Sequence, residues 1–458
     1  MRNSRGISGM DLRRLLVELE QLYFRDYANY WGEAVGRIAL AAINDFSDGA
    51  EQLAGLTSAN SPILQLLVQV RENTRFPVVA DTVDDAADAA GKPVEKGSKL
   101  GKLAVATAGK ASDALVKKLP DTARKSLQSR FESLHRLLDD NNGPTADLIP
   151  AMTALNELQM QMASLARSSS PEQAAFEVAK IRMGGQRDAL SNLRTASGRL
   201  PRPVGVWFNV LAEDTWRLVL SDAYRYLNQR YQSELYSFYA KAISKRYPFS
   251  AHSASDVAIS DFREFFKAQG IADQFFDSYL RAFVSGDPGH YRMRSVDGQS
   301  LPISKVYLDQ MAAARVIRQS FFADNPAEPQ VQFKLEPYTL DPAVSRSALR
   351  FGDTTIEYRH GPIVPVSFKW PTDAEDGRAS LVLDKMVGRP LGIEKNTGPW
   401  SLFRLFDLMQ TEYLTGRDVL VLKADVGGLR ANYLLTSQRA PNPFDTGVLR
   451  TFRLPVQL

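Results

Sequence analysis

Apolar residues recur at helical spacing from about residue 11 to residue 324. In the clearest stretch, between Pro203 and Tyr247, they fall within a sector of about 100° around a helix axis. These residues are Trp216, Leu220, Ala223, Leu227, Tyr231, Phe238 and Ala242. The pattern predicts one long amphipathic helix over about 204–246, with the stripe in a core or at a helix–helix contact. At about 1.5 Å per residue it would be about 60 Å long, which suits a strut. Glu234 lies on the same face and needs a partner if it is buried.

Shorter helices have readable starts. Ser61-Pro62 and Ser170-Pro171 each place a serine at the N-cap and a proline at the first helical position. Between them, residues 144–167 repeat methionine and leucine at a spacing that suits helix packing. Gly184-Gly185 is expected to end or bend the helix that starts at Pro171.

Aromatic residues concentrate between Asp261 and Val284. They are Phe262, Phe265, Phe266, Phe275, Phe276, Tyr279 and Phe283. Such a cluster is typical of a buried core, so we expect the later helices to pack around it.

After about Pro326 the apolar period changes to two. Alternating residues are Val331, Phe333 and Leu335, and then Val364, Val366, Phe368 and Trp370. Further predicted strands are 354–359, 380–384, 419–423, 431–435 and 448–454, separated by glycine, proline and asparagine. One helix is expected from Gly398-Pro399-Trp400 to about Thr411. The sequence therefore predicts an α + β multidomain protein, a long all-α region followed by a C-terminal β-sandwich containing one helix.

The predicted domains follow these changes of pattern. Residues 1–80 form an N-terminal helical region, residues 120–325 a helical domain with the long helix, and residues 326–458 the β-sandwich. Residues 81–119 are rich in Ala, Lys, Asp and Gly, and we interpret them as a low-complexity, mobile connection. A basic patch for nucleic acid or anionic lipid is the alternative. No aromatic residue lies between Phe76 and Phe131, so stacking on bases is not available there and we expect no nucleic-acid partner.

Composition narrows the function classes. The 458 residues carry a net charge of only +4, and there is no cysteine, which excludes disulfides and thiol catalysis. No window approaches the about 18 apolar residues that cross a bilayer, and the first residues lack a signal-peptide core. We expect the chain by itself to be soluble, and export would need a segment upstream of Met1.

Motifs for catalysis are absent from the sequence. There is no phosphate-binding loop, no G-x-G-x-x-G, no H-E-x-x-H and no G-x-S-x-G, so we expect no cofactor, no metal site and no catalytic residue. The histidines are far apart, and His360 sits between two predicted strands, where a turn role is favoured. Pairs such as Asp139-Asp140 and Asp373-Asp376 fit solvated loop ends, although a glycosidase pair drawn from distant positions stays open.

A series of motifs in the last third of the chain identifies a family. In order they are Tyr358-Arg359-His360-Gly361-Pro362, Phe368-Lys369-Trp370-Pro371, 398–407 (GPWSLFRLFD), Asn442-Pro443-Phe444 and Phe452-Arg453-Leu454-Pro455. The series resembles the end of the TssM (IcmF-type) family of type VI secretion proteins. The helical region agrees, with Leu22-Tyr23-Phe24-Arg25-Asp26-Tyr27, Ser61-Pro62-Ile63, Arg246-Tyr247-Pro248-Phe249 and 261–266 (DFREFF).

These motifs also have a physical interpretation. In 398–407 the apolar side chains would seal a helix onto the sandwich, and Arg404 would face a carboxylate or helix C-terminal carbonyls. The motifs are therefore expected to preserve the fold.

The resemblance implies a location and partners. The chain would be the periplasmic region of an inner-membrane-anchored protein in a Gram-negative bacterium. It would bind the outer-membrane lipoprotein TssJ through its C-terminal β-domain, work with TssL through a membrane part that lies elsewhere, and self-associate in the full complex.

For the partner contact we select two loops, 371–379 and 437–447, and within them Asp373, Asp376 and Asn442. Two alternatives stay open. One is an envelope hydrolase that uses His360 or Asp373, and the other is a glycan- or lipid-binding module on a helical stalk.

Overall fold

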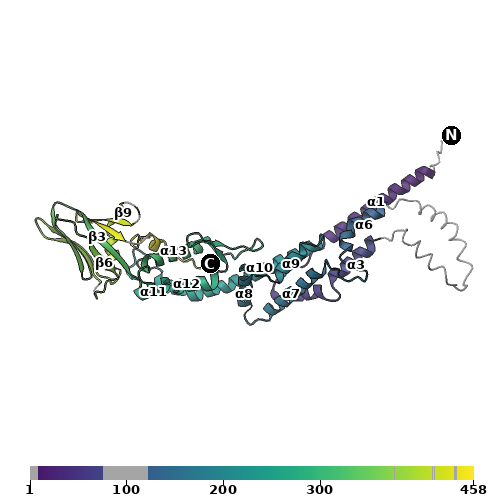
Figure 1. Ribbon diagram of the computed structural model, residues 1–458, viewed down its shortest axis with the longest axis horizontal. Coiled ribbons are helices and arrows are strands. Elements are labelled where there is room, and N and C mark those ends of the chain that lie inside the picture. Colours follow the sequence, from purple (N-terminus) through teal and green to yellow (C-terminus); the bar gives the residue numbers. More distant parts are fainter. Residues whose placement is uncertain (1–8, 76–121, 376, 415, 417, 438–440) are drawn as a thin grey trace, which may run out of the picture. The chain divides into compact units, whose positions relative to one another are not determined.

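The computed structural model describes residues 9–75, 122–375, 377–414, 416, 418–437 and 441–458 (Figure 1). The chain divides into two compact units, residues 1–174 with 186–219, and residues 175–185 with 220–458. The predicted mobile segment 81–119 and Asp376 lie outside the described residues. The predicted boundaries at residues 80, 119 and 325 remain predictions.

The first unit is a bundle of helices. α2 packs on α7, α7 on α9, and α6 on both α1 and α3. The bounds are α1 Gly9–Gly36, α2 Phe46–Thr57, α3 Pro62–Thr74, α6 Thr122–His135, α7 Ile149–Ala166 and α9 Ala189–Ser197. Leu53, Leu155, Leu158 and Met162 are fully buried in this bundle, as the spacing of apolar residues requires.

The predicted start of α3 is confirmed in position and corrected in detail. Ser61 is the N-cap and Pro62 the first helical residue, but the Ser61 side chain does not cap the helix. Its hydroxyl donates instead to the carbonyl of Leu56 at 2.6 Å, at the end of α2. Ser61 therefore closes the turn between the two helices.

The predicted long helix is present, but its last turns are π-helical and therefore contain more residues per turn than the expected α-helix. Residues 204–243 are helical without a break, as α10 (Val204–Arg230) and two π-helical segments, η2 (Tyr231–Tyr236) and η3 (Tyr239–Ile243). π-helical bonding, as from Ser244 N to Tyr239 O at 2.7 Å, widens each turn. The buried residues after Tyr231 are therefore Leu235, Tyr239 and Ile243. The predicted stripe positions Phe238 and Ala242 are only half-buried.

Glu234 has the partners that its position required. Its carboxylate pairs with Arg230 and accepts a hydrogen bond from the Tyr279 hydroxyl at 3.1 Å. The charge on this half-buried face is therefore compensated.

The helical part of the second unit is organised around the predicted aromatic cluster. All the phenylalanines of that cluster are buried, and Tyr279 is half-buried. The elements are α8 (Pro171–Met183), η2, η3, α11 (Ile259–Phe266), α12 (Ile271–Phe275), η4 (Phe276–Leu280), the short pair β1 (Val284–Ser285) and β2 (Arg292–Met293), and α13 (Lys305–Phe321). Gly185, with φ +86°, follows α8 as expected for a helix-ending glycine.

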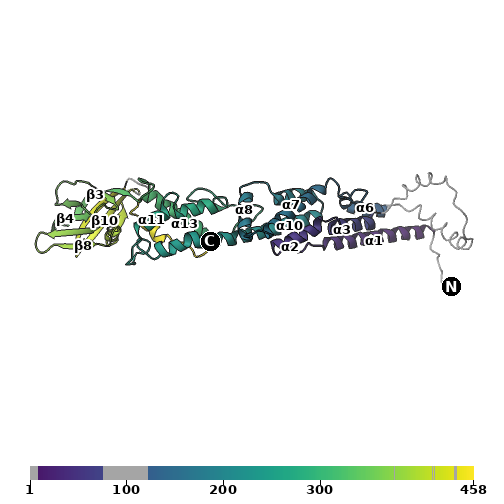
Figure 2. The same cartoon turned by 90° about the horizontal axis from the view of Figure 1, so that it is seen from below.

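The β-part consists of two antiparallel sheets, which confirms the predicted fold class. A five-stranded sheet has the order β6-β3-β11-β10-β9 and a four-stranded sheet the order β5-β4-β7-β8 (Figure 2). The bounds are β3 Val331–Leu340, β4 Val344–Phe351, β5 Thr354–Tyr358, β6 Val366–Trp370, β7 Ala379–Lys385, β8 Leu391–Lys395, β9 Gln410–Tyr413, β10 Val419–Val426 and β11 Leu429–Ser437. Alternating burial in β3 and β7 places their apolar side chains in the core.

Several predicted elements in this part are wrong. The helix expected to close near Thr411 is α14 (Ser401–Phe406), and Thr411 lies in β9. The strand expected at 448–454 is the short helix α15 (Gly447–Thr451), so the β-part holds a second helix. β4, β8 and β9 were not predicted: β4 has a mixed burial pattern, β8 has no fully buried residue, and β9 is exposed throughout. No helix within the described residues is both long enough and apolar enough to cross a membrane.

The shifted register of the long helix can be tested by a matched pair of substitutions. Ile243→Ala should lower the free energy of unfolding by about 2–5 kcal/mol, because it leaves a cavity at a fully buried position. Ala242→Ser, one residue earlier, should change it by less than about 0.5 kcal/mol. Urea unfolding followed by circular dichroism measures both. Equal losses would contradict the π-helical register.

The end of α6 holds a buried histidine. His135 Nε2 lies 2.7 Å from Thr74 Oγ1, and the Thr74 hydroxyl donates to the carbonyl of Val70. Because a hydroxyl has one proton to donate, Nε2 of the imidazole is the donor in its contact with Thr74. Burial, followed by the positive charges of Arg75 and Arg71, lowers the pKa of His135 below its ordinary value of 6.5.

This lowered pKa predicts the direction of a pH effect. As the pH falls, His135 takes up a proton in the unfolded chain at a higher pH than in the folded chain. The contribution of neutral His135 to stability is therefore complete above about pH 6.5 and is lost as the pH falls below that value. Unfolding of the first unit should need less urea at pH 5.5 than at pH 7, by an amount that His135→Gln reduces. His252→Gln, at an exposed position of the other unit, is the control. A dependence that persists unchanged in His135→Gln would refute the assignment.

Candidate functional site

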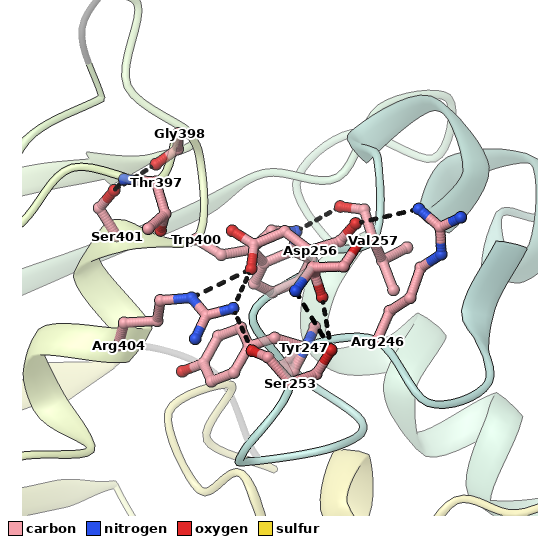
Figure 3. Close-up of polar contacts among 12 residues, drawn as sticks. Arg246, Tyr247, Ser253, Asp256, Val257, Thr397, Gly398, Trp400, Ser401 and Arg404 are labelled. Carbon is pink, nitrogen blue, oxygen red and sulfur yellow. Dashed lines mark hydrogen bonds and ion pairs between the residues drawn. The ribbon is translucent and has the colours of Figure 1, made fainter.

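The turn before α14 fastens the β-part to the helical part of the second unit. Gly398 has φ +100°, a conformation that glycine adopts without strain. The next carbonyl, of Pro399, accepts a hydrogen bond from Trp370 Nε1 at 2.7 Å. Trp400 is fully buried, and its Nε1 donates to the carbonyl of Val257 at 2.7 Å (Figure 3). Both indoles therefore have their polar atom satisfied inside the core.

Arg404, one helical turn further, binds the helical part through charge. Its Nε donates to Asp256 Oδ1 at 3.0 Å, and its Nη2 donates to the carbonyl of Ser253 at 2.8 Å (Figure 3). The two charged side chains are only 14% and 15% exposed. The expectation that Arg404 faces a carboxylate or helix C-terminal carbonyls is confirmed for the carboxylate, Asp256, whereas the carbonyl that it also binds, of Ser253, belongs to the loop after η3.

Two guanidinium groups lie over the ring of Tyr247. The Cζ of Arg404 is 3.9 Å and that of Arg450 4.7 Å from the centre of its ring. Its hydroxyl donates to Asp407 Oδ2 at 2.7 Å, and Asp407 also pairs with Arg450. Burial, and then the negative charge of Asp407, raise the pKa of Tyr247, so the phenol keeps the proton that it donates. This cation–π stacking joins residues from α14, the C-terminal segment and the loop after η3.

Aromatic rings fill the space beneath this charged layer. Trp400 contacts Trp370 of β6 and Phe262 of α11, with ring centres 4.7 Å and 5.4 Å apart. Phe321 of α13 lies 5.5 Å from Trp370. Helices and strands thus share one continuous apolar core, and we call it, with the charged layer above it, the α–β junction.

The chain returns to the helical part after β11. Phe452 is fully buried, with its ring centre 5.8 Å from Phe249 and 5.3 Å from Phe266. Tyr231 and Tyr224 donate to the carbonyls of Pro455 and Leu458. The β-part is therefore attached at both of its sequence ends, through α13 before it and residues 447–458 after it.

The chemistry of this junction is structural. Its charged groups pair with one another or with carbonyls, as the distances above show. In the described part of the chain, no group of three or more His, Asp or Glu side chains could hold a metal ion. His360 lies in a turn after β5 with φ +58°, as predicted, and its Nε2 lies 2.7 Å from the carbonyl oxygen of Val344.

The predicted partner-binding residues have different surroundings. Asp373, in the turn after β6, is 85% exposed and pairs with Lys369 at 2.9 Å. Asn442 is 3% exposed. Its amide oxygen accepts from Phe444 N and its nitrogen donates to the carbonyl of Asp418. A role in partner binding stays a prediction for both.

Sequence reasoning missed most of the junction. Asp256, Tyr247, Asp407 and Arg450 were not selected, although Tyr247 and Asp407 stand in motifs that carried the family resemblance. The available signal was a charged or hydroxyl-bearing residue inside an otherwise apolar motif. Their partners are 43–160 residues away in sequence, so no local pattern could join them.

Comparisons with known proteins agree along the chain. The model for the type VI secretion protein IcmF C2-like domain matches residues 333–439, and that for the IcmF helical domain matches residues 222–327. An IcmF-related model, described as intracellular multiplication and human macrophage-killing, matches residues 2–75.

One curated relative is the type VI secretion system component TssM1 of Pseudomonas aeruginosa. It is 27% identical over 457 residues, which is 98% of this chain and 40% of that protein. The chain therefore spans less than half the length of this relative.

Two solved structures have the same fold. A chain of a "Type VI secretion system membrane core complex" has a TM-score of 0.69 at 19% identity, covering 97% of this chain and 84% of that one. A chain of a "Type VI membrane complex" has a TM-score of 0.67 at 20% identity, covering 96% and 79%.

The energetic role of the junction can be tested on its buried ion pair. Arg404→Met should lower the free energy of unfolding by about 3–5 kcal/mol, because Asp256 is left buried without its partner. Arg281→Met removes an exposed partner of Asp277 and should cost less than about 1 kcal/mol. Thermal melting of both variants makes the comparison. Similar melting temperatures would show that the junction contributes little.

Proposed function

Since the chain belongs to the IcmF (TssM) family of type VI secretion proteins, we propose that it is a non-catalytic structural component of the type VI secretion membrane complex. The α–β junction is the observation that carries this proposal. Its charged side chains are paired within the chain, and its aromatic rings join helices and strands in one core. Such a junction supports a role in holding the helical part and the β-part of the second unit in a fixed arrangement.

The finer proposal concerns place and partners. The chain is the periplasmic region of an inner-membrane-anchored protein, and it links that membrane to the outer-membrane lipoprotein TssJ through its β-part. TssL is bound by a portion of such proteins that this chain does not include, and copies associate in the full complex. The family membership and the two structural relatives support this proposal at the level of the complex.

A contact at the turn after β6 would suit the exposed carboxylate there. Asp373 projects into solvent and pairs with Lys369. Asn442 is buried, so its contribution would be to shape the loop that follows β11. We therefore place the first test on Asp373.

An envelope hydrolase is the less favoured alternative. His360 is engaged by the carbonyl of Val344, and Asp373 by the ammonium group of Lys369. Among the described residues, neither side chain has a serine or threonine hydroxyl as a hydrogen-bond partner, which a base-activated hydroxyl nucleophile would require.

Lipoprotein binding can be measured on the whole chain with soluble TssJ. Asp373→Lys should weaken binding about tenfold, because it reverses a charge at the proposed contact. Asp309→Lys is the matched control, since Asp309 is an exposed residue of α13 that also pairs with a lysine four residues away. The whole chain is used because residues 449–458 pack on the helical part.

Hydrogen–deuterium exchange gives an independent reading of the same complex. TssJ should protect loops of the β-part, whether or not Asp373 itself is in contact. Protection confined to the first unit would overturn the assignment to the β-part.

A further inference from the structure

Two loops lie at the same end of the four-stranded sheet. In the β4–β5 pair Ser347 is opposite Tyr358, and in the β4–β7 pair Val344 is opposite Lys385. The chain therefore leaves β5 and β7 at the end where β4 begins (β4 and β8 are labelled in Figure 2). We call the two loops, residues 359–365 and 385–390, the apolar tip.

Backbone contacts hold both loops against the start of β4. His360 Nε2 lies 2.7 Å from the carbonyl oxygen of Val344, and Met386 N donates to the carbonyl of Ala343 at 2.9 Å. Two consecutive residues of the chain thus position the two loops, which makes the loops neighbours.

Large aliphatic side chains project from both loops. Ile363 is 51%, Val364 64%, Met386 61% and Val387 89% exposed. Single exposed apolar residues are ordinary, but a group of them on adjoining loops marks an interaction surface.

The charges of the apolar tip have one sign. Its loops contain Arg359, Lys385 and Arg389 and no carboxylate. Of the carboxylates nearest in sequence, Asp384 pairs with Arg346 at the edge of the sheet, and Glu357 pairs with both Arg346 and the exposed Arg359. A partner with anionic groups beside an apolar layer would match this surface.

We propose that the apolar tip binds the surface of an anionic phospholipid bilayer. Its aliphatic side chains enter the boundary between headgroups and acyl chains, and its three cationic side chains contact lipid phosphates. Short loops reach only the outermost about 5–10 Å of a bilayer, the depth at which peripheral proteins anchor. A protein partner is the weaker match, because protein interfaces favour aromatic residues at their centre and this tip presents only aliphatic ones. The proposal goes beyond the function proposed above and does not depend on lipoprotein binding.

Vesicle co-sedimentation of the whole chain tests the apolar contribution. Phosphatidylethanolamine vesicles with a quarter phosphatidylglycerol should pull down the protein, and Val387→Asp should lower the bound fraction about tenfold. Val306→Asp is the matched control, an equally aliphatic, 58% exposed residue in the first turn of α13, where a carboxylate is tolerated. No binding, or equal loss in both variants, would overturn the proposal.

The charged contribution is tested separately. Arg359→Gln, Lys385→Gln and Arg389→Gln should each weaken binding roughly fivefold, since each basic residue near an anionic surface contributes about that factor. Phosphatidylcholine vesicles should bind the wild-type chain weakly. Binding that is the same for neutral and anionic vesicles would refute the phosphate contact.

A fluorescent label can report the depth of the tip directly. The chain has no cysteine, so Val387→Cys and Val306→Cys each give one labelling site. An environment-sensitive nitrobenzoxadiazole label should shift its emission to shorter wavelength at position 387 when vesicles are added, and not at position 306. If instead the label at 387 responds to protein concentration without vesicles, the tip contacts a second copy and the lipid proposal fails.

Discussion

The burial of Trp400 beside the Arg404–Asp256 ion pair is the interaction on which the second unit depends. Apolar burial drives the association of α14 with the helices, because two indole rings and several phenylalanines leave water together. The ion pair adds direction, since a buried charge tolerates only the arrangement that brings its partner close. Together with the two guanidinium groups over the ring of Tyr247, these contacts both stabilise the junction and fix its orientation.

The fold was largely predictable where one face of an element is buried. The helical stripe and the alternation in β3 and β6 reflect burial on one side, which gives apolar residues a regular spacing in the sequence. The proline residues mark the helix starts. The prediction failed where burial does not produce a regular spacing of apolar residues. The strand β4 carries Arg346 and Arg350 on its other face, and the π-helical turns after Arg230 change the number of residues per turn. Residues 448–454 were predicted as a strand, but Gly447–Thr451 form a helical turn, and none of the described strands pairs with this segment.

For each contact of the candidate site, the sequence predicted at most one of the two residues. An arginine among apolar residues, as in 398–407, requires an acceptor, and that acceptor could be named by kind. The particular acceptor residue could not be predicted, because Asp256 is 148 residues away and no sequence periodicity relates it to Arg404. The same reasoning explains why Asn442 was read as a loop residue. An asparagine beside proline favours a turn, and the sequence does not reveal whether its side-chain amide forms hydrogen bonds with water or with backbone groups.

The return of residues 449–458 to the helices has a consequence for the order of folding. The phenylalanine core around Phe249 and Phe266 is completed by Phe452, which is synthesised after the whole β-part. A nascent chain can form its early helices one by one, but it cannot close this core until the ribosome has finished those last residues. The apolar surface that Phe452 covers in the folded unit therefore stays exposed until that segment has been synthesised.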